Sequence, residues 1–102
     1  MKRRTLIYTE EAGADLDWIY DTIASASSPA TASRYEQRIR AFCEGLEFAS
    51  ERGTQRDEVR PGLRAIGFQK RVTVAFIVEA ERVVILRIFY GGVDWVDELS
   101  ED

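Results

Sequence analysis

Two segments near the end of the sequence, Val72–Glu79 and Val83–Tyr90, constrain the fold most strongly. Each has the composition of a β-strand, and each is apolar at consecutive positions and not only at alternate ones. Apart from the terminal Glu79, only Thr73 and Arg87 are neither apolar nor aromatic. A sheet with one face in water alternates apolar and polar side chains. The sheet that contains these strands therefore needs cover on both of its faces.

The same part of the chain predicts a third strand and three turns. Leu63–Phe68 alternates like a strand, residues 69–70 form the turn after it, and residues 80–81 join the last two strands. Ahead of the third strand, Pro61-Gly62 suits the central positions of a type II turn. Strict alternation divides the last strand into one face with Val83, Ile85, Arg87 and Phe89 and a second face with Val84, Leu86, Ile88 and Tyr90.

Helical spacing replaces alternation earlier in the chain. Thr5–Tyr8 is typical of a short strand, and Thr9 follows it as a cap for a helix with an acidic first turn. A second helix is expected to begin near Ala30, with Pro29 just before it or at its first position. The side chains expected to be buried are Ala12, Leu16, Ile19, Tyr20 and Ile23, then Ala32, Tyr35, Ile39, Cys43, Leu46 and Ala49, whereas Asp15, Asp17 and Asp21 are expected to point away.

The order β-α-α-β-β-β follows, and it predicts an α+β fold in which a small sheet packs on a helical hairpin. At 102 residues we expect one domain over 1–102, with residues 93–102 as a short acidic tail. The two helices can cover only one face of the sheet. The second face needs the tail, through Trp95, Val96 and Leu99, or another polypeptide. Because the tail is short, we expect a partner protein there.

The charges are unevenly distributed along an acidic chain of net charge −4. Residues 52–71 hold six cations against Asp57 and Glu58, whereas residues 94–102 hold five acids and no cation. Nucleic-acid binders normally carry a net basic footprint. We therefore expect no specific nucleic-acid binding by the chain alone. The basic segment is either an ordinary solvated surface or a charge-guided contact with a partner.

Several classes of protein and site do not fit the composition. No apolar run approaches the roughly 20 residues that span a bilayer, and the N-terminal apolar run is too short for a signal peptide. The single cysteine, Cys43, has no partner for a disulfide within the chain. These features favour a cytoplasmic protein. Histidine is absent, so we expect no metal site, no cofactor and no histidine-dependent nucleophile.

Arginine and tyrosine chemistry remains, at Arg64, Arg71, Arg87 and Tyr90. Arg87 interrupts an apolar strand face, where an isolated buried charge would cost several kcal/mol. It needs either a carboxylate partner such as Asp94 or a ligand, which would be a phosphate or a carboxylate of a partner protein bound by the guanidinium fork.

The chain resembles ParE-type toxins of the RelE/ParE toxin–antitoxin superfamily over nearly its whole length. The motifs that carry the resemblance are A..DL..IY..IA at 12–24, P..A..Y...I...C..L at 29–46, G..RDEVRPGLR at 53–64, F..R..V.F.V at 68–78 and V.ILRI..G..D at 83–94. Members commonly carry a histidine before the strand-terminal glycine and an arginine before the aspartate. Here Tyr90 and Val93 occupy these two places.

The resemblance implies a toxin that binds and inhibits DNA gyrase and is neutralised by a ParD-like antitoxin. Under this hypothesis we expect no catalytic residue, and the candidates for target binding are Arg60, Arg64, Arg71, Arg87 and Trp95. The RelE branch offers an alternative, a ribosome-dependent mRNA endonuclease in which Arg71 and Arg87 stabilise the phosphate and Tyr90 assists proton transfer. A third possibility is an interaction module without toxicity.

Overall fold

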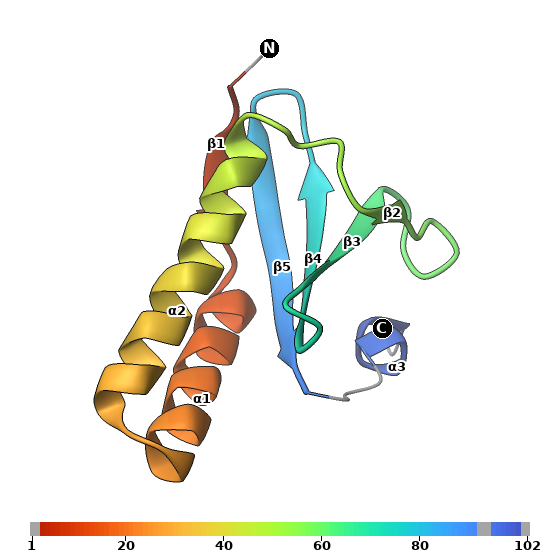
Figure 1. Ribbon diagram of the computed structural model, residues 1–102. Coiled ribbons are helices and arrows are strands. Elements are labelled where there is room, and N and C mark those ends of the chain that lie inside the picture. The colour runs from red at the N-terminus through yellow and green to blue at the C-terminus, as the bar shows by residue number, and fades with distance from the viewer. Residues whose placement is uncertain (1–2, 92–94, 101–102) are drawn as a thin grey trace.

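The computed structural model describes residues 3–91 and 95–100 of the chain (Figure 1). The predicted order β-α-α-β-β-β and the α+β class are confirmed, with β2, η1 and α3 as additions that the pattern did not predict. The elements are β1 Thr5–Tyr8, α1 Glu10–Ala26, α2 Pro29–Glu44, the 3₁₀ turn η1 Gly45–Glu47, β2 Thr54–Gln55, β3 Leu63–Phe68, β4 Val72–Val78, β5 Arg82–Tyr90 and α3 Trp95–Ser100.

The five strands form one mixed sheet in the order β1-β5-β4-β3-β2. β1 is parallel to β5, and the other neighbours are antiparallel. The hairpin of α1 and α2 lies on one side of the sheet and α3 lies on the other (Figure 1). No helix within the described residues is long and apolar enough to cross a bilayer.

Side-chain caps fix the start of both long helices. Thr9 accepts a hydrogen bond from the backbone N–H of Ala12, as the sequence predicts, and Ser28 does the same for Thr31. Pro29 occupies the first turn of α2, where its missing N–H costs nothing. The helices bury their apolar faces against one side of the sheet, in a core formed by Ala12, Leu16, Ile19, Ile39, Cys43, Leu46, Val72, Val74, Phe76, Val83, Ile85 and Ile88.

The prediction of strict alternation along β5 is wrong beyond Ile85. Ala75 pairs with Arg87 and Phe76 with Ile85, so Leu86 is an extra residue opposite an unbroken β4. Such a bulge exchanges the two faces of a strand. Ile88 therefore joins the helix-side core, and Phe89 turns to the opposite face.

The opposite face has a core of its own, in which Leu99 of α3 packs with Leu63, Ala75 and Phe89. The expectation that a partner rather than the tail would cover this face is therefore wrong for this part of it. Farther along the face, Ile77 and Val84 are half-buried and Ile7 of β1 is 37% exposed. α3 covers one end of the second face.

The turns next to β3 hold left-handed backbone conformations. Gly62 has φ of 81°, and the N–H of Leu63 donates to the carbonyl of Arg60 at 3.0 Å, so the predicted type II turn is confirmed. Gln69 and Lys70 also have positive φ values, of 54° and 64°. This arrangement suits the right-handed twist of a tight hairpin.

We expect Gly53→Ala to destabilise the fold more than Gly62→Ala does. Both glycines have positive φ, which disfavours alanine by about 1 kcal/mol. At Gly53 a Cβ atom would also lie 2.5 Å from the carbonyl oxygen of Ala65, whereas at Gly62 no atom lies within 4 Å. The expected losses in free energy of unfolding are about 2 kcal/mol and about 1 kcal/mol. Urea denaturation of the two variants measures them, and equal losses would contradict the contact with Ala65.

Candidate functional site

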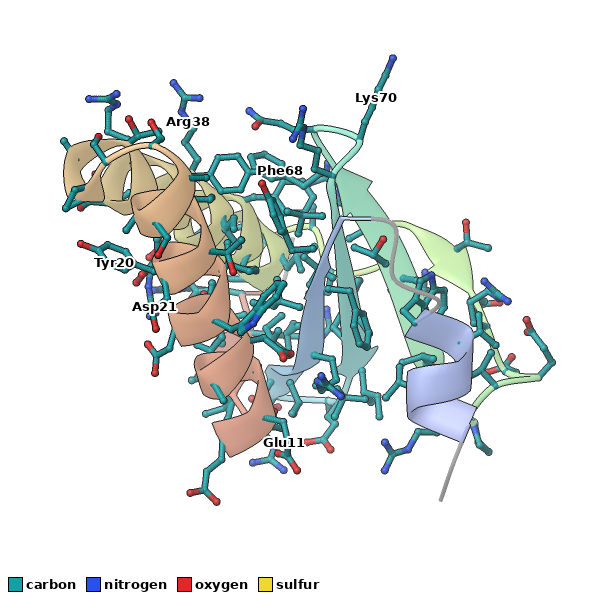
Figure 2. The ribbon with its side chains drawn as sticks, turned by 90° about the horizontal axis from the view of Figure 1, so that it is seen from below. Glu11, Tyr20, Asp21, Arg38, Phe68 and Lys70 are labelled. Carbon is teal, nitrogen blue, oxygen red and sulfur yellow. The ribbon has the colours of Figure 1, made fainter. Side chains whose placement is uncertain are left out.

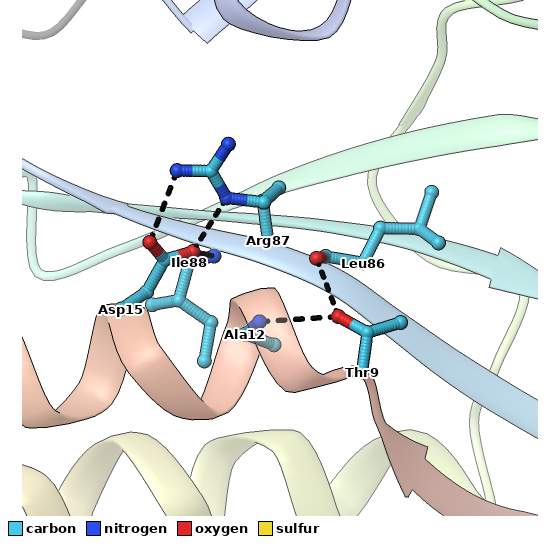
Figure 3. Close-up of polar contacts among 6 residues, drawn as sticks. All are labelled: Thr9, Ala12, Asp15, Leu86, Arg87 and Ile88. Atoms are coloured by element: carbon cyan, nitrogen blue, oxygen red, sulfur yellow. Dashed lines mark hydrogen bonds and ion pairs between the residues drawn. The ribbon is translucent and has the colours of Figure 1, made fainter.

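Arg87 forms a two-point ion pair with Asp15 of α1 (Figure 3). Its Nε donates to Oδ2 at 2.8 Å and its Nη2 to Oδ1 at 3.0 Å. The guanidinium also lies 4.8 Å from the ring centroid of Phe89. The Arg87 and Asp15 side chains retain exposures of 25% and 16%, so the pair is only partly screened by water.

The carboxylate of Asp15 also closes a gap in the sheet. β1 ends at Tyr8, so the edge of β5 beyond Ile85 has no strand beside it. There the backbone N–H of Ile88 donates to Asp15 at 2.8 Å, and the hydroxyl of Thr9 donates to the carbonyl of Leu86 at 2.8 Å (Figure 3). Side chains from the start of α1 thus replace the missing strand.

Two expectations about these residues need correction. Asp15 does not point away from the buried face, because the exposed edge of β5 offers it both a charge and a backbone donor. The suggested partner Asp94 lies outside the described residues, and the ion pair that the structure shows for Arg87 is with Asp15. Helical periodicity alone does not reveal an acidic residue that reaches a distant strand edge.

The basic segment 52–71 divides between the two sides of the sheet. Arg56 forms an ion pair with Glu58, and its guanidinium lies 4.9 Å from the ring centroid of Trp95. Arg60 is exposed beside the turn that Asp57 stabilises by accepting from the N–H of Gly62. The loop between β2 and β3 is therefore tied to α3 on the second face.

Of the other cations, Arg52 and Arg64 lie on the helix side near a pair of phenylalanine rings, and Lys70 and Arg71 lie in the turn between β3 and β4. Phe42 of α2 and Phe68 of β3 are 4.8 Å apart, and Arg52 lies 5.9 Å from the centroid of Phe42. Arg64 donates to the carbonyl of Arg52 at 3.2 Å. We call the set Tyr35, Phe42, Phe68, Arg34, Arg38, Arg52, Arg64, Lys70 and Arg71 the aromatic–basic surface.

Tyr90 joins this surface to α1 through edge-to-face ring contacts. Its ring centroid lies 5.9 Å from that of Tyr35 and 6.4 Å from that of Trp18, which is 57% exposed. Burial raises the pKa of Tyr35 and Tyr90 adds to the increase, whereas the positive charge of Arg71 opposes it. Arg71 and Tyr90 therefore both lie close enough to Tyr35 to influence the pKa of its hydroxyl.

The structure brings together some of the candidate residues and separates others. Arg71 and Tyr90 share one end of the sheet, where the N–H of Gly91 donates to the carbonyl of Arg71. The guanidinium of Arg87 is held at Asp15 instead. Trp95 belongs to α3 and Arg60 to the loop between β2 and β3, whereas Arg64 lies on the helix side beside Arg52. The candidates therefore do not form one site, and Arg87 is separated from the others by its ion pair with Asp15.

Within residues 3–91 and 95–100, no cluster of three or more acidic, cysteine or histidine side chains is arranged to hold a metal ion. The groups with the most strongly altered pKa values, Tyr8 and Cys43, lie in the helix-side core.

We expect the free energy of unfolding to fall as the pH rises from about 9 to about 11. Burial raises the pKa of Cys43 from 9.0 to about 11, and burial together with the neighbouring Cys43 raises the pKa of Tyr8. The unfolded chain then loses these protons before the folded chain does, so alkaline pH favours unfolding. Urea denaturation across this range should show a smaller fall for Cys43→Ala. An identical fall in this variant would contradict the contribution of the thiol.

Comparison with known proteins gives consistent matches. A family model described as the ParE toxin of the type II toxin–antitoxin system parDE matches residues 6–95. Toxin ParE3 of Caulobacter vibrioides is 29% identical over 96 residues, which cover 94% of this chain and 95% of that relative. A solved chain from the chromosomal ParDE TA system of P. aeruginosa is also 29% identical. It has a TM-score of 0.76, and the match covers 87% of this chain and 97% of that chain.

Proposed function

Because the chain belongs to the ParE toxin family of type II toxin–antitoxin systems, we propose that it inhibits DNA gyrase by binding and that a ParD-like antitoxin neutralises it. The match to the family over residues 6–95 is the observation that carries the proposal. The fold supports it, because the similarity to a chain of a ParDE system extends over 97% of that chain. On this proposal the protein acts in the cytoplasm and is not an enzyme.

The position of Arg87 also supports inhibition by binding over ribonuclease activity. A ribonuclease of the RelE type would need Arg71, Arg87 and Tyr90 to converge on one phosphate. The guanidinium of Arg87 instead donates two hydrogen bonds to Asp15, and it would have to exchange a partly buried carboxylate for the substrate. We therefore assign Arg87 a structural role and retain Arg60, Arg64, Arg71 and Trp95 as candidates for target binding.

Controlled expression in bacteria tests the function. We expect growth arrest with a DNA-damage response, linearised plasmid in the presence of purified gyrase, and relief by a co-expressed ParD-like antitoxin. In a translating lysate the mRNA should remain intact. Codon-specific cleavage of the mRNA would favour the ribonuclease instead, and complex formation with no toxicity would favour a pure interaction module.

We expect the double variant Arg60→Glu/Arg64→Glu to reduce inhibition of gyrase by about tenfold or more, because it reverses two positive charges at the β2–β3 loop and β3. Retained melting temperature would show that the variant is folded. The matched control reverses Arg3 and Arg82, which lie at the β1 side of the sheet and change the net charge equally. Full inhibition by the folded Arg60→Glu/Arg64→Glu variant would show that neither Arg60 nor Arg64 contributes to binding of the target.

A further inference from the structure

Trp18 of α1 is open to solvent and yet supported by other rings of the molecule. Its exposure of 57% is the highest among the large hydrophobic side chains of the described residues. The indole meets the ring of Tyr90 edge to face, and Tyr90 in turn meets Tyr35 in the same way. These two tyrosines belong to β5 and α2. Three elements therefore hold the indole in place while more than half of its surface remains free.

The other strongly exposed aromatic side chain differs in this respect. Phe48 is 51% exposed, but the guanidinium of Arg3 lies over its ring, 5.5 Å from the centroid. A tryptophan that is already positioned loses little conformational entropy when it binds, and it offers a large apolar area together with an N–H donor. Such side chains dominate the binding energy of many protein interfaces. Trp18 has the properties of an interface anchor.

The residues beside Trp18 on α1 form one continuous exposed stripe. Positions three and four residues apart on a helix lie on the same side. Figure 2 shows Glu11 near the start of α1, and Asp21 farther along the helix on the side away from the sheet. All members of the stripe are exposed, and we call them the Trp18 stripe: Glu11, Ala14, Trp18, Asp21 and Ser25.

The charge of this stripe is negative. α1, from Glu10 to Ala26, carries five acidic residues and no cation. Asp15 is neutralised within the molecule by Arg87. Neither Glu11 nor Asp21 forms an ion pair with another residue of the described part of the chain. An exposed indole between carboxylates complements an apolar pocket that is surrounded by cations.

We propose that the Trp18 stripe contacts the target of the toxin, with Trp18 in an apolar pocket rimmed by lysine and arginine side chains. This inference rests on the proposed function, in which the target is DNA gyrase. An enzyme that acts on DNA carries basic surfaces that neutralise phosphates. The carboxylates of the stripe are attracted to such a surface and repelled by DNA itself. The stripe therefore binds where DNA leaves the basic surface free.

The stripe also adjoins one of the cations already considered for target binding. Tyr90 supports Trp18 on one side, and it is followed by Gly91, whose N–H donates to the carbonyl of Arg71 at 2.8 Å. An acidic surface with a tryptophan and a cation thus lie on either side of Tyr90. Charges of opposite sign at one interface fix the orientation of a partner.

Hydroxyl-radical footprinting provides the first test, because Trp18 and Phe48 are both exposed and both readily oxidised. Free toxin, its complex with gyrase and its complex with the ParD-like antitoxin are compared by peptide mass spectrometry. We expect oxidation of Trp18 to slow at least fivefold in the gyrase complex, with a change below twofold at Phe48. Protection of Trp18 by the antitoxin but not by gyrase would overturn the proposal.

Truncation of the anchor provides the second test. We expect Trp18→Ala to weaken inhibition of gyrase by about 30-fold, as for an interface hot spot, and Phe48→Ala to weaken it less than threefold. Both positions are exposed, so unchanged melting temperatures are expected and would show that the variants are folded. Equal effects of the two substitutions would overturn the inference. So would loss of self-association by Trp18→Ala with inhibition intact, because the stripe would then bind a second copy of the chain.

Charge reversal tests the chemistry of the partner separately. We expect Glu11→Lys/Asp21→Lys to weaken inhibition about tenfold at low salt and less at high salt. Glu44→Lys/Glu51→Lys is the matched control, since it makes the same charge change at two exposed positions outside α1. Stronger inhibition by the α1 variant would contradict a basic partner surface.

The unaltered chain separates the two levels of the argument. If it does not inhibit gyrase, the proposed function fails and this inference fails with it. If it inhibits gyrase and the Trp18 stripe variants behave like their controls, only this inference fails.

Discussion

Asp15→Ala is expected to lower the free energy of unfolding by about 3 kcal/mol, since it removes one partner from a partly buried ion pair. The substitution leaves the guanidinium of Arg87 without the carboxylate that accepts two of its hydrogen bonds. It also removes the acceptor of the Ile88 N–H on a strand edge that β1 does not reach. Urea denaturation at neutral pH measures the loss.

Asp21→Ala is the matched control, because Asp21 lies on the exposed side of the same helix. We expect a change within about 0.5 kcal/mol there. The loss in free energy of unfolding for Asp15→Asn should lie between those for Asp15→Ala and Asp21→Ala. The amide oxygen still accepts from the N–H of Ile88, but it does not neutralise the charge of Arg87. If Asp15→Ala were as mild as the control, the ion pair would make no net contribution to the fold.

Phe76→Ala is expected to cost about 4 kcal/mol, the largest loss for a single substitution considered in this protein. Phe76 is fully buried in the helix-side core, and it lies in β4 beside the bulge opposite Leu86. A small residue would leave a cavity that neither the helical hairpin nor the sheet can fill. For a domain of this size the loss is a large part of the total stability.

Phe48→Ala offers the same chemical change at an exposed position. Phe48 is 51% exposed and lies beneath the guanidinium of Arg3. We expect a cost below about 1 kcal/mol. Both variants lose an aromatic ring, so the difference between their urea unfolding midpoints measures the effect of burial. Similar midpoints for Phe76→Ala and Phe48→Ala would contradict the position of Phe76 in the core.

Local patterns predicted the elements well because each depends on neighbouring residues. The bounds of β1 and β3, the Thr9 cap and the turn at Pro61-Gly62 all follow from short-range preferences. Short-range preferences do not predict which face of the sheet each β5 residue occupies beyond Ile85. A bulge sets these faces, and it depends on how β4 and β5 pair across the sheet. Two-residue β2 is too short to produce a periodic signal.

The candidate site was less predictable for the same reason. The sequence identified the cations of residues 52–71, but it could not assign Arg56 to Trp95 and Arg64 to the helix side, since these positions depend on the path of the loop in space. It identified Arg87 as a charge in need of a partner. The partner lies in α1, 72 positions away, and nothing local to either residue marks the pair.

The parallel pairing of β1 with β5 has a consequence for the synthesis of the toxin. β5 lies inside the sheet, and contacts such as that of Thr9 with Leu86 join residues 77 positions apart. A nascent chain that lacks β5 has neither the neighbour of β1 nor the strand on which α1 packs. Distant pairing of this kind slows folding. The fold therefore forms only after β5 has been synthesised and has paired between β1 and β4.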